Sequence, residues 1–267
     1  PAERDQLAQL IFQVGAIPVI DITCSDRSSV PKGAWIRTRS KRDIPGKGPV
    51  ILAGENHRSA IRGRETWLEV SKPKKVPRGF AGIILRGKEV GGVSGEDSVF
   101  NDWAKLSPQT TMLDGGIEPK DLPSITEKGF AGIICSDLLL GFPAFALPPN
   151  LLHLLSIADS SFVYQSKSFS GFATPLSKAL QQLIQGETWW KVCEGWLRLD
   201  LPSEKMPPWG EKALQSLSIA RQYDSLFHFL AAYTGKSIPT LSSVAYVSLP
   251  IISSSKAPDA TSSVIES

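Results

Sequence analysis

Short apolar runs, each bounded by glycine, proline, serine or charged residues, recur through the first half of the chain. Runs of about four to eight residues with such boundaries are typical of β-strands. The pattern predicts seven strands, at residues 17–23, 33–38, 49–53, 66–70, 81–86, 110–114 and 131–135. Ahead of them, residues 3–14 space their apolar side chains at helical intervals and end at Gly15, so we expect an amphipathic helix there.

A seven-residue segment occurs twice with almost the same sequence. Residues 79–85 read Gly-Phe-Ala-Gly-Ile-Ile-Leu, and residues 129–135 repeat this with Cys at the end. Each copy reads as a helix-ending glycine, a tight turn and a buried strand, as in parallel β/α barrels. We therefore expect an α/β fold, a (β/α)8 TIM-like barrel with the two copies as neighbouring strands. Since eight strands close such a barrel and a helix precedes the first predicted strand, an eighth strand is expected before Pro1.

The connections in the first half are short and polar. Residues 24–32 and 39–48 cannot hold a packed crossover helix, which parallel strands normally require. This half is therefore expected either to be eroded, with loops in place of helices, or to be partly antiparallel. In the later half, residues 98–106 and 119–128 are both predicted to be single helices.

The character of the chain changes after residue 141. An apolar segment broken by prolines leads into predicted helices at residues 151–157, 175–185 and 213–232, and four of the seven tryptophans gather in this part. Such rings commonly plug an open barrel end or seat one module on another. Beyond residue 252 the chain is rich in serine, as in linkers between domains. We expect a barrel at residues 1–141, a helical Trp-rich appendage packed on it at 142–249 and a flexible linker at 250–267, all within a longer polypeptide.

Composition narrows the classes of partner. The 267 residues are 42% apolar and 21% charged, and the longest apolar stretch falls well short of the roughly 20 residues that cross a bilayer. Three separated cysteines without CxxC spacing fit reduced thiols in the cytoplasm. The net charge of +3 has its basic excess in the first third, without interleaved aromatics. We expect a cytoplasmic protein with neither nucleic-acid nor membrane partners.

Two glycine pairs follow predicted strands and suggest a site for a flavin phosphate. In such barrels, backbone amides at the last strand ends bind the phosphate, and glycine allows the close approach. The candidate cofactor-binding residues are Gly91, Gly92, Gly115, Gly116 and Ser136. The neighbouring Asp137 would repel a phosphate dianion, which argues against tight flavin binding. For the second glycine pair, an ordinary strand-to-loop turn with positive backbone φ is favoured over flavin binding.

Residues 85–100, 114–117 and 129–140 together resemble the nitronate monooxygenases, also called 2-nitropropane dioxygenases. The similarity is closer to the nitronate-monooxygenase-like barrel at the amino terminus of large type I polyketide and fatty-acid synthases, since it continues past the barrel to about residue 235. The resemblance implies a barrel of the FMN-binding type. It also implies neighbouring synthase domains as partners, namely ketosynthase, acyltransferase and acyl carrier.

The resemblance places a catalytic histidine after the first glycine pair, but the matching position here is Val93, which cannot move a proton. His57, His153 and His228 follow no glycine pair and are expected to be surface or packing residues. Glu89 would be an alternative base if it were desolvated. We therefore assign no catalytic residue and no metal site.

The sequence leaves two functions open. The first is a non-catalytic or vestigial barrel, without a cofactor, that serves as a scaffold or docking module in a multidomain polyketide synthase. The parent protein would then be an acyltransferase-class enzyme. The second is an FMN-dependent oxidoreductase of the enoyl reductase or nitronate monooxygenase type. A homodimer is compatible with both.

Overall fold

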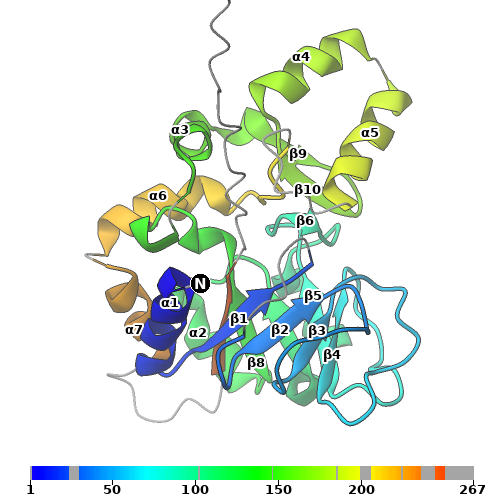
Figure 1. Ribbon diagram of the computed structural model, residues 1–267. Helices are drawn as coiled ribbons and strands as arrows, with labels where there is room; N and C mark the ends of the chain where they lie inside the picture. The colour runs from blue at the N-terminus through cyan, green and yellow to red at the C-terminus, as the bar shows by residue number, and fades with distance from the viewer. Residues whose placement is uncertain are drawn as a thin grey trace, which may run out of the picture.

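The chain folds into a barrel with an appendage at one end, as the computed structural model shows in Figure 1. The structure describes residues 2–23, 30–101, 103–145, 147–184, 186–198, 206–223, 225–235 and 244–249. The linker expected at 250–267 lies outside these residues, so it stays a prediction. No helix of the described part is long and apolar enough to cross a membrane.

All seven predicted strands are present in the barrel. They are β1 (Ile17–Asp21), β2 (Trp35–Thr38), β3 (Val50–Leu52), β4 (Thr66–Val70), β5 (Gly82–Arg86), β7 (Thr111–Asp114) and β8 (Gly132–Cys135). Every pair of neighbours is parallel, and the sheet closes in the order β1-β11-β8-β7-β5-β4-β3-β2. The expected TIM-like barrel is confirmed. The partly antiparallel alternative is wrong for these strands.

The eighth strand comes from the other end of the chain. We expected it before Pro1, but its place between β8 and β1 is filled by β11 (Val244–Leu249). Strand order around a closed barrel is cyclic, so the missing strand can be supplied from either end of the sequence. Residues 244–249, which the sequence placed in the helical appendage, therefore belong to the barrel.

The two copies of the seven-residue repeat are strands of this one barrel. Their strands, β5 and β8, are separated by β7, which pairs with both. The expectation of direct neighbours was therefore wrong by one strand. The repeat marks two equivalent entries into the barrel wall, since Phe80 and Phe130 are both buried ahead of their strands.

Loops replace helices in the first half of the barrel wall. Residues 39–49, 53–65 and 71–81 connect β2 to β5 and contain no helix in these fully described stretches. The helix expected at 98–106 appears as short 3-10 turns, η1 (Val99–Asn101) and η2 (Trp103–Lys105), and η3 (Pro108–Thr110) follows. The helix expected at 119–128 is confirmed as η4 (Pro119–Asp121) continued by α2 (Leu122–Glu127).

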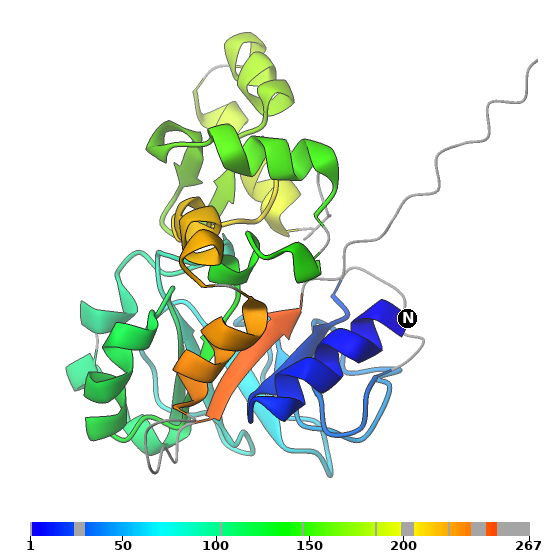
Figure 2. The ribbon, with the colours of Figure 1, turned by 90° about the vertical axis from the view of Figure 1, so that its left-hand side faces the viewer.

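Two helices far apart in sequence cover the wall beside β11. These are α1 (Ala2–Gln13), as predicted from the apolar spacing, and α7 (Leu226–Thr234), seen on either side of β11 in Figure 2. The single helix expected at 213–232 is in fact two, α6 (Ala213–Gln222) and α7. The second helix begins at Ser225, whose hydroxyl accepts a hydrogen bond from the His228 amide, a capping contact that sets a new helix start.

The appendage lies at the carboxyl ends of the barrel strands, above them in Figure 1. It contains a small antiparallel sheet in the order β6-β10-β9 and helices on top of it. The strands are β6 (Gly92–Val93), β9 (Val163–Gln165) and β10 (Phe169–Phe172). Its helical elements are η5 (Asp137–Leu139), η6 (Pro143–Phe145), α3 (Pro149–Ile157), η7 (Ser160–Phe162), α4 (Pro175–Leu183) and α5 (Glu187–Arg198).

The middle of the barrel is filled by one apolar side chain from each of the seven strands with described side chains. They form a separate buried cluster of Val19, Trp35, Ile51, Trp67, Ile84, Met112 and Ile134. The indole rings of Trp35 and Trp67 lie 6.0 Å apart within it. The barrel is therefore a packed core, and any site must lie at its ends.

Candidate functional site

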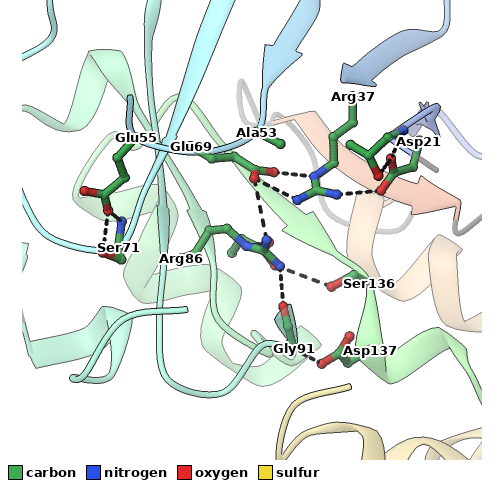
Figure 3. Close-up of polar contacts among 12 residues, drawn as sticks. Asp21, Arg37, Ala53, Glu55, Glu69, Ser71, Arg86, Gly91, Ser136 and Asp137 are labelled. Carbon is green, nitrogen blue, oxygen red and sulfur yellow. Dashed lines mark hydrogen bonds and ion pairs between the residues drawn. The ribbon is translucent and has the colours of Figure 1, made fainter. Parts of the chain in front are cut away.

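A layer of mostly polar side chains closes the barrel interior at the carboxyl ends of the strands. Side chains alternate between the two faces of a strand, so the residue two positions after an interior residue also points inward. Two positions beyond the apolar cluster, the seven strands supply Asp21, Arg37, Ala53, Glu69, Arg86, Asp114 and Ser136. We call these seven residues the mouth layer; Figure 3 shows six of them labelled, facing one another.

Arg37 connects two carboxylates of the mouth layer. Its Nη1 lies 2.6 Å from Asp21 Oδ2. Its Nε and Nη2 lie 2.6 and 2.9 Å from the two carboxylate oxygens of Glu69. A guanidinium that meets both oxygens of a carboxylate makes a strong and directional contact. The pairing ties β1, β2 and β4 together across the mouth.

Arg86 continues this chain of alternating charge. Its Nη1 lies 3.5 Å from Glu69 Oε2 and its Nε lies 3.1 Å from Asp114 Oδ2. Its Nη2 donates a hydrogen bond of 2.8 Å to the carbonyl oxygen of Gly91 (Figure 3). The Ser136 hydroxyl lies 3.5 Å from Asp114 Oδ1. Six of the seven mouth-layer residues, all except Ala53, thus form one connected polar network.

The centre of the network is closed to solvent. Glu69, Arg86 and Asp114 are only 4%, 8% and 3% exposed. Charges at this depth are stable only when they are paired and hydrogen-bonded. The mouth layer therefore fills the carboxyl end of the barrel with paired side chains, at the place where enzymes of this barrel architecture hold their reacting groups.

Burial and the arginines set the ionisation of the carboxyl groups. Burial disfavours the charge of Glu69, but Arg37 and Arg86 outweigh it and hold its pKa below the ordinary value. For Asp114 burial dominates and raises the pKa to about 6, with Arg86 opposing the rise. The pKa values of Glu69 and Asp114, which both contact Arg86, are thereby shifted in opposite directions.

Asp137 follows the mouth layer at the end of β8 and is also buried. Its Oδ2 accepts hydrogen bonds from the backbone amides of Gly91, at 3.0 Å, and Gly210, at 2.6 Å. Burial raises the pKa of Asp137 to about 7, against the opposing effect of the Gly210 amide. Asp114 nearby adds to the rise. One carboxyl oxygen of Asp137 is thus engaged by two backbone amides.

Residues 206–212, which we call the cover segment, lie directly on the loop that follows β5. A Cβ atom added to Gly91 would lie 1.9 Å from the carbonyl oxygen of Pro208, and one added to Gly210 would lie 2.1 Å from that of Glu89. The Lys212 amide also donates to the Glu89 carbonyl at 3.3 Å. The two backbones are therefore in contact, which requires glycine on both sides.

The first glycine pair does not open onto a ligand space. Gly91 faces Pro208 and Asp137, while Gly92 is part of β6 and pairs with Ser170 of β10. Val93, at the position where the resemblance places a histidine, pairs with Phe169 and packs in the apolar cluster of the appendage. Val93 is therefore a packing residue of the appendage, at the position where the resemblance places the base.

The second glycine pair is covered by side chains of the same chain. A Cβ on Gly115 would lie 2.4 Å from a methyl group of Val99, and one on Gly116 would lie 2.1 Å from Cγ of Lys212. Gly116 also has a φ of +63°, as the turn alternative expects. Lys212 Nζ is paired with Glu118 Oε1 at 2.8 Å.

The other candidate bases are not placed to act at the mouth. His153 and His228 are exposed on helices α3 and α7. His57 lies nearest to the mouth, with Nε2 3.1 Å from the carbonyl oxygen of Ala53. Glu89 is buried, and its Oε2 has no hydrogen-bond partner among the described residues. It lies in the loop under the cover segment, beside Gly87.

These contacts decide whether the residues fit a phosphorylated flavin. The candidate residues were Gly91, Gly92, Gly115, Gly116 and Ser136, which the structure brings to one end of the barrel. However, Pro208 lies against Gly91, Val99 against Gly115 and Lys212 against Gly116. The Gly91 amide also already donates a hydrogen bond to Asp137. At Gly91, Gly115 and Gly116 the space beside the backbone is therefore filled by the chain itself, which does not fit an FMN phosphate at these three residues.

Comparison with solved structures finds the same architecture elsewhere. A structure of FabK from Thermotoga maritima aligns with a TM-score of 0.60 over 86% of this chain and 89% of that chain, at 13% sequence identity. The fold is FabK-like. A mutant form of FabK from the same organism aligns with a TM-score of 0.52 over 79% of each chain, also at 13% identity. No family model and no curated protein matches the sequence. The likeness establishes the fold, and the closer similarity to synthase barrels stays a prediction.

The sequence contains a signal for the mouth layer, in the form of charged residues within β4 and β5. Glu69 and Arg86 are charged residues inside runs that are otherwise apolar. A charge at the same inward position near the ends of several predicted barrel strands indicates a shared polar layer. Pairing these positions requires the barrel register, which aligns Glu69 with Ile84 and Arg86 with Asp114.

The raised pKa values predict how stability depends on pH. Asp114 and Asp137 keep their protons in the folded state up to about pH 6 and about pH 7, whereas unfolded aspartate loses its proton near 3.9. Between these limits the folded state binds more protons, so the free energy of unfolding should fall as the pH rises from about 4 to about 7. Glu69, with its lowered pKa, acts in the opposite sense only below about pH 4.5.

Urea denaturation at a series of pH values from 5 to 8 measures this dependence. Asp137→Asn keeps an acceptor oxygen but cannot titrate. The free energy of unfolding of this variant should therefore no longer fall as the pH rises above about 6. An unchanged slope in the variant would show that another group is responsible.

Proposed function

We propose that this chain is a FabK-like barrel without flavin chemistry, and that it serves as a scaffold or docking module of a multidomain synthase of the type I polyketide class. The observation that carries the proposal is the closed mouth. The mouth layer contains a network of paired charges with a buried centre, and the cover segment lies in backbone contact with the loop after β5.

The chemistry of the mouth supports a non-catalytic role. A general base must lie within hydrogen-bond reach of a bound substrate. Here Glu69 is held ionised between Arg37 and Arg86, and Val93 packs away in the appendage. Such a network rigidifies the end of the barrel more readily than it moves protons.

The synthase part of the proposal comes from the sequence resemblance. Its partners would be ketosynthase, acyltransferase or acyl carrier domains of the same polypeptide. A docking role is tested with the purified ketosynthase domain from the same reading frame. Co-elution and a saturable binding isotherm support docking, and their absence argues for a purely structural spacer.

The second candidate is an FMN-dependent oxidoreductase, favoured by the FabK-like fold and by two glycine pairs at the barrel end. In that case the cover segment would have to move away from Gly91 to admit the cofactor. The base would then come from a residue outside the mouth layer, such as His57, whose Nε2 lies 3.1 Å from the carbonyl oxygen of Ala53.

Flavin binding separates the two candidates. We expect the purified protein to be colourless, and FMN added to about 1 mM should cause no saturable change in flavin fluorescence and no rise in melting temperature. Protein that is yellow, with one FMN per chain and turnover of an enoyl or nitronate substrate, would contradict the proposal. Riboflavin serves as the control, because it lacks the phosphate that glycine amides bind.

A further inference from the structure

Asp137 makes contacts that a residue at the start of a short helical turn does not need. Asp137 begins η5, yet its carboxyl group bonds to none of the amides of that turn. Its partners are 46 and 73 residues away in the sequence, in the loop after β5 and in the cover segment. The contact therefore belongs to tertiary structure and brings three distant segments to one oxygen atom.

The two amides are aimed at one point because their backbones touch. Gly91 packs on Pro208 and Gly210 packs on Glu89, each at a distance that leaves no room for a side chain. Two N–H groups that converge on one oxygen form the kind of site that binds carboxylates and other oxyanions. Here the chain itself supplies the ligand.

The charges around the carboxyl group are mixed. Arg86 attracts a negative charge at this position, while Asp114 repels it. Cys135, one strand position before the mouth layer, is buried, and its thiol pKa is raised well above the ordinary range by that burial. It therefore stays neutral. Burial and Asp114 favour the protonated carboxyl group, whereas the amides of Gly210 and Gly91, together with Arg86, favour the carboxylate.

We propose that the amides of Gly91 and Gly210 form a carboxylate-binding site, that Asp137 is its built-in ligand, and that this contact latches the cover segment over the mouth layer. A free small carboxylate such as formate is the class of ligand that fits the same place once Asp137 is shortened. The inference rests on the proposed function, in which the mouth is closed.

Hydrogen exchange in Asp137→Ala tests the latch. Loss of the two hydrogen bonds to the Asp137 carboxyl group should speed exchange of the amides in residues 87–92 and 209–212 by about tenfold to a hundredfold. Sodium formate at about 100 mM should return exchange toward the wild-type rate in a saturable manner. Sodium chloride at the same ionic strength should not.

Two variants serve as controls. Asp137→Asn keeps an oxygen that accepts both amides, so its exchange should stay close to wild type. Ser216→Ala removes a buried hydrogen bond to the Ala213 carbonyl within α6 and should leave exchange in residues 87–92 unchanged. Exchange in Asp137→Ala equal to wild type, or acceleration that formate does not reverse, overturns the proposal.

If Asp137→Ala does not fold, NMR of the wild-type protein decides. The amide protons of Gly91 and Gly210 should shift together on pH titration with one common midpoint, because they share one acceptor. Independent or absent titration overturns the latch. Flavin binding by the wild type would instead contradict the proposed function, whatever formate does to the variant, so the two failures can be told apart.

Discussion

Replacing Arg86 by methionine is expected to lower the free energy of unfolding by about 3–5 kcal/mol. The side chain is buried and lies between Glu69 and Asp114, and it also donates to the Gly91 carbonyl. Removing it leaves two carboxyl groups close together without the shared cation. Breaking a buried pair in this way costs far more than the pair itself contributes. Urea denaturation at pH 7 measures the loss.

The same variant should respond to acid in a characteristic way. Without Arg86, the pKa of Asp114 should rise further, so the variant should gain more stability than the wild type as the pH falls from 7 toward 5 and the carboxyl groups take up protons. Lys120→Met is the matched control, because it removes an exposed cation from Glu118. Its unfolding midpoint should stay unchanged. Equal losses in both variants would show that the mouth layer is not a specially buried network.

A methyl group at Gly91 should be the second most damaging change, at about 3 kcal/mol or more. The new Cβ of Gly91→Ala would lie 1.9 Å from the Pro208 carbonyl oxygen. Backbone atoms on both sides must then move apart. That movement also lengthens the hydrogen bond from Gly91 to Asp137, so exchange in the cover segment should rise together with the loss of stability.

Gly195→Ala is the control for the glycine substitution. Gly195 lies within α5, and a Cβ there meets no atom within 4 Å. Alanine is favoured over glycine inside a helix by about 1 kcal/mol, so this variant should be as stable as wild type or slightly more stable. If both variants behave alike in denaturation, the close approach of the cover segment to Gly91 is not a tight contact in solution.

The strand positions were predictable because each strand is a local apolar run with its own boundary residues. β4 and β5 read as buried strands from a few residues alone, and both are buried throughout. The break between α6 and α7 was harder, since apolar spacing continues through it. The break is set by Ser225, which caps the start of α7, and a serine among polar residues is only a weak local signal for a new helix.

The site was predictable only in part, because its contacts join residues far apart in the sequence. The glycine pairs were located at the correct end of the barrel, but what covers Gly116 is Lys212. Asp137 was noticed as a carboxylate that would repel a phosphate. The structure gives it another role, since it accepts the amides of Gly91 and Gly210 itself. No local pattern specifies that pairing.

The position of β11 has a consequence for how the protein folds. Strand β1 pairs with it on one side, and β8 pairs with it on the other. Until residues 244–249 leave the ribosome, both strands are exposed edges that can pair with other chains. Closing the ring also joins the most distant parts of the sequence, which is the slow class of contact in folding. The barrel is therefore most exposed to aggregation in the interval between the synthesis of β8 and that of β11, when seven strands are present and the eighth is missing.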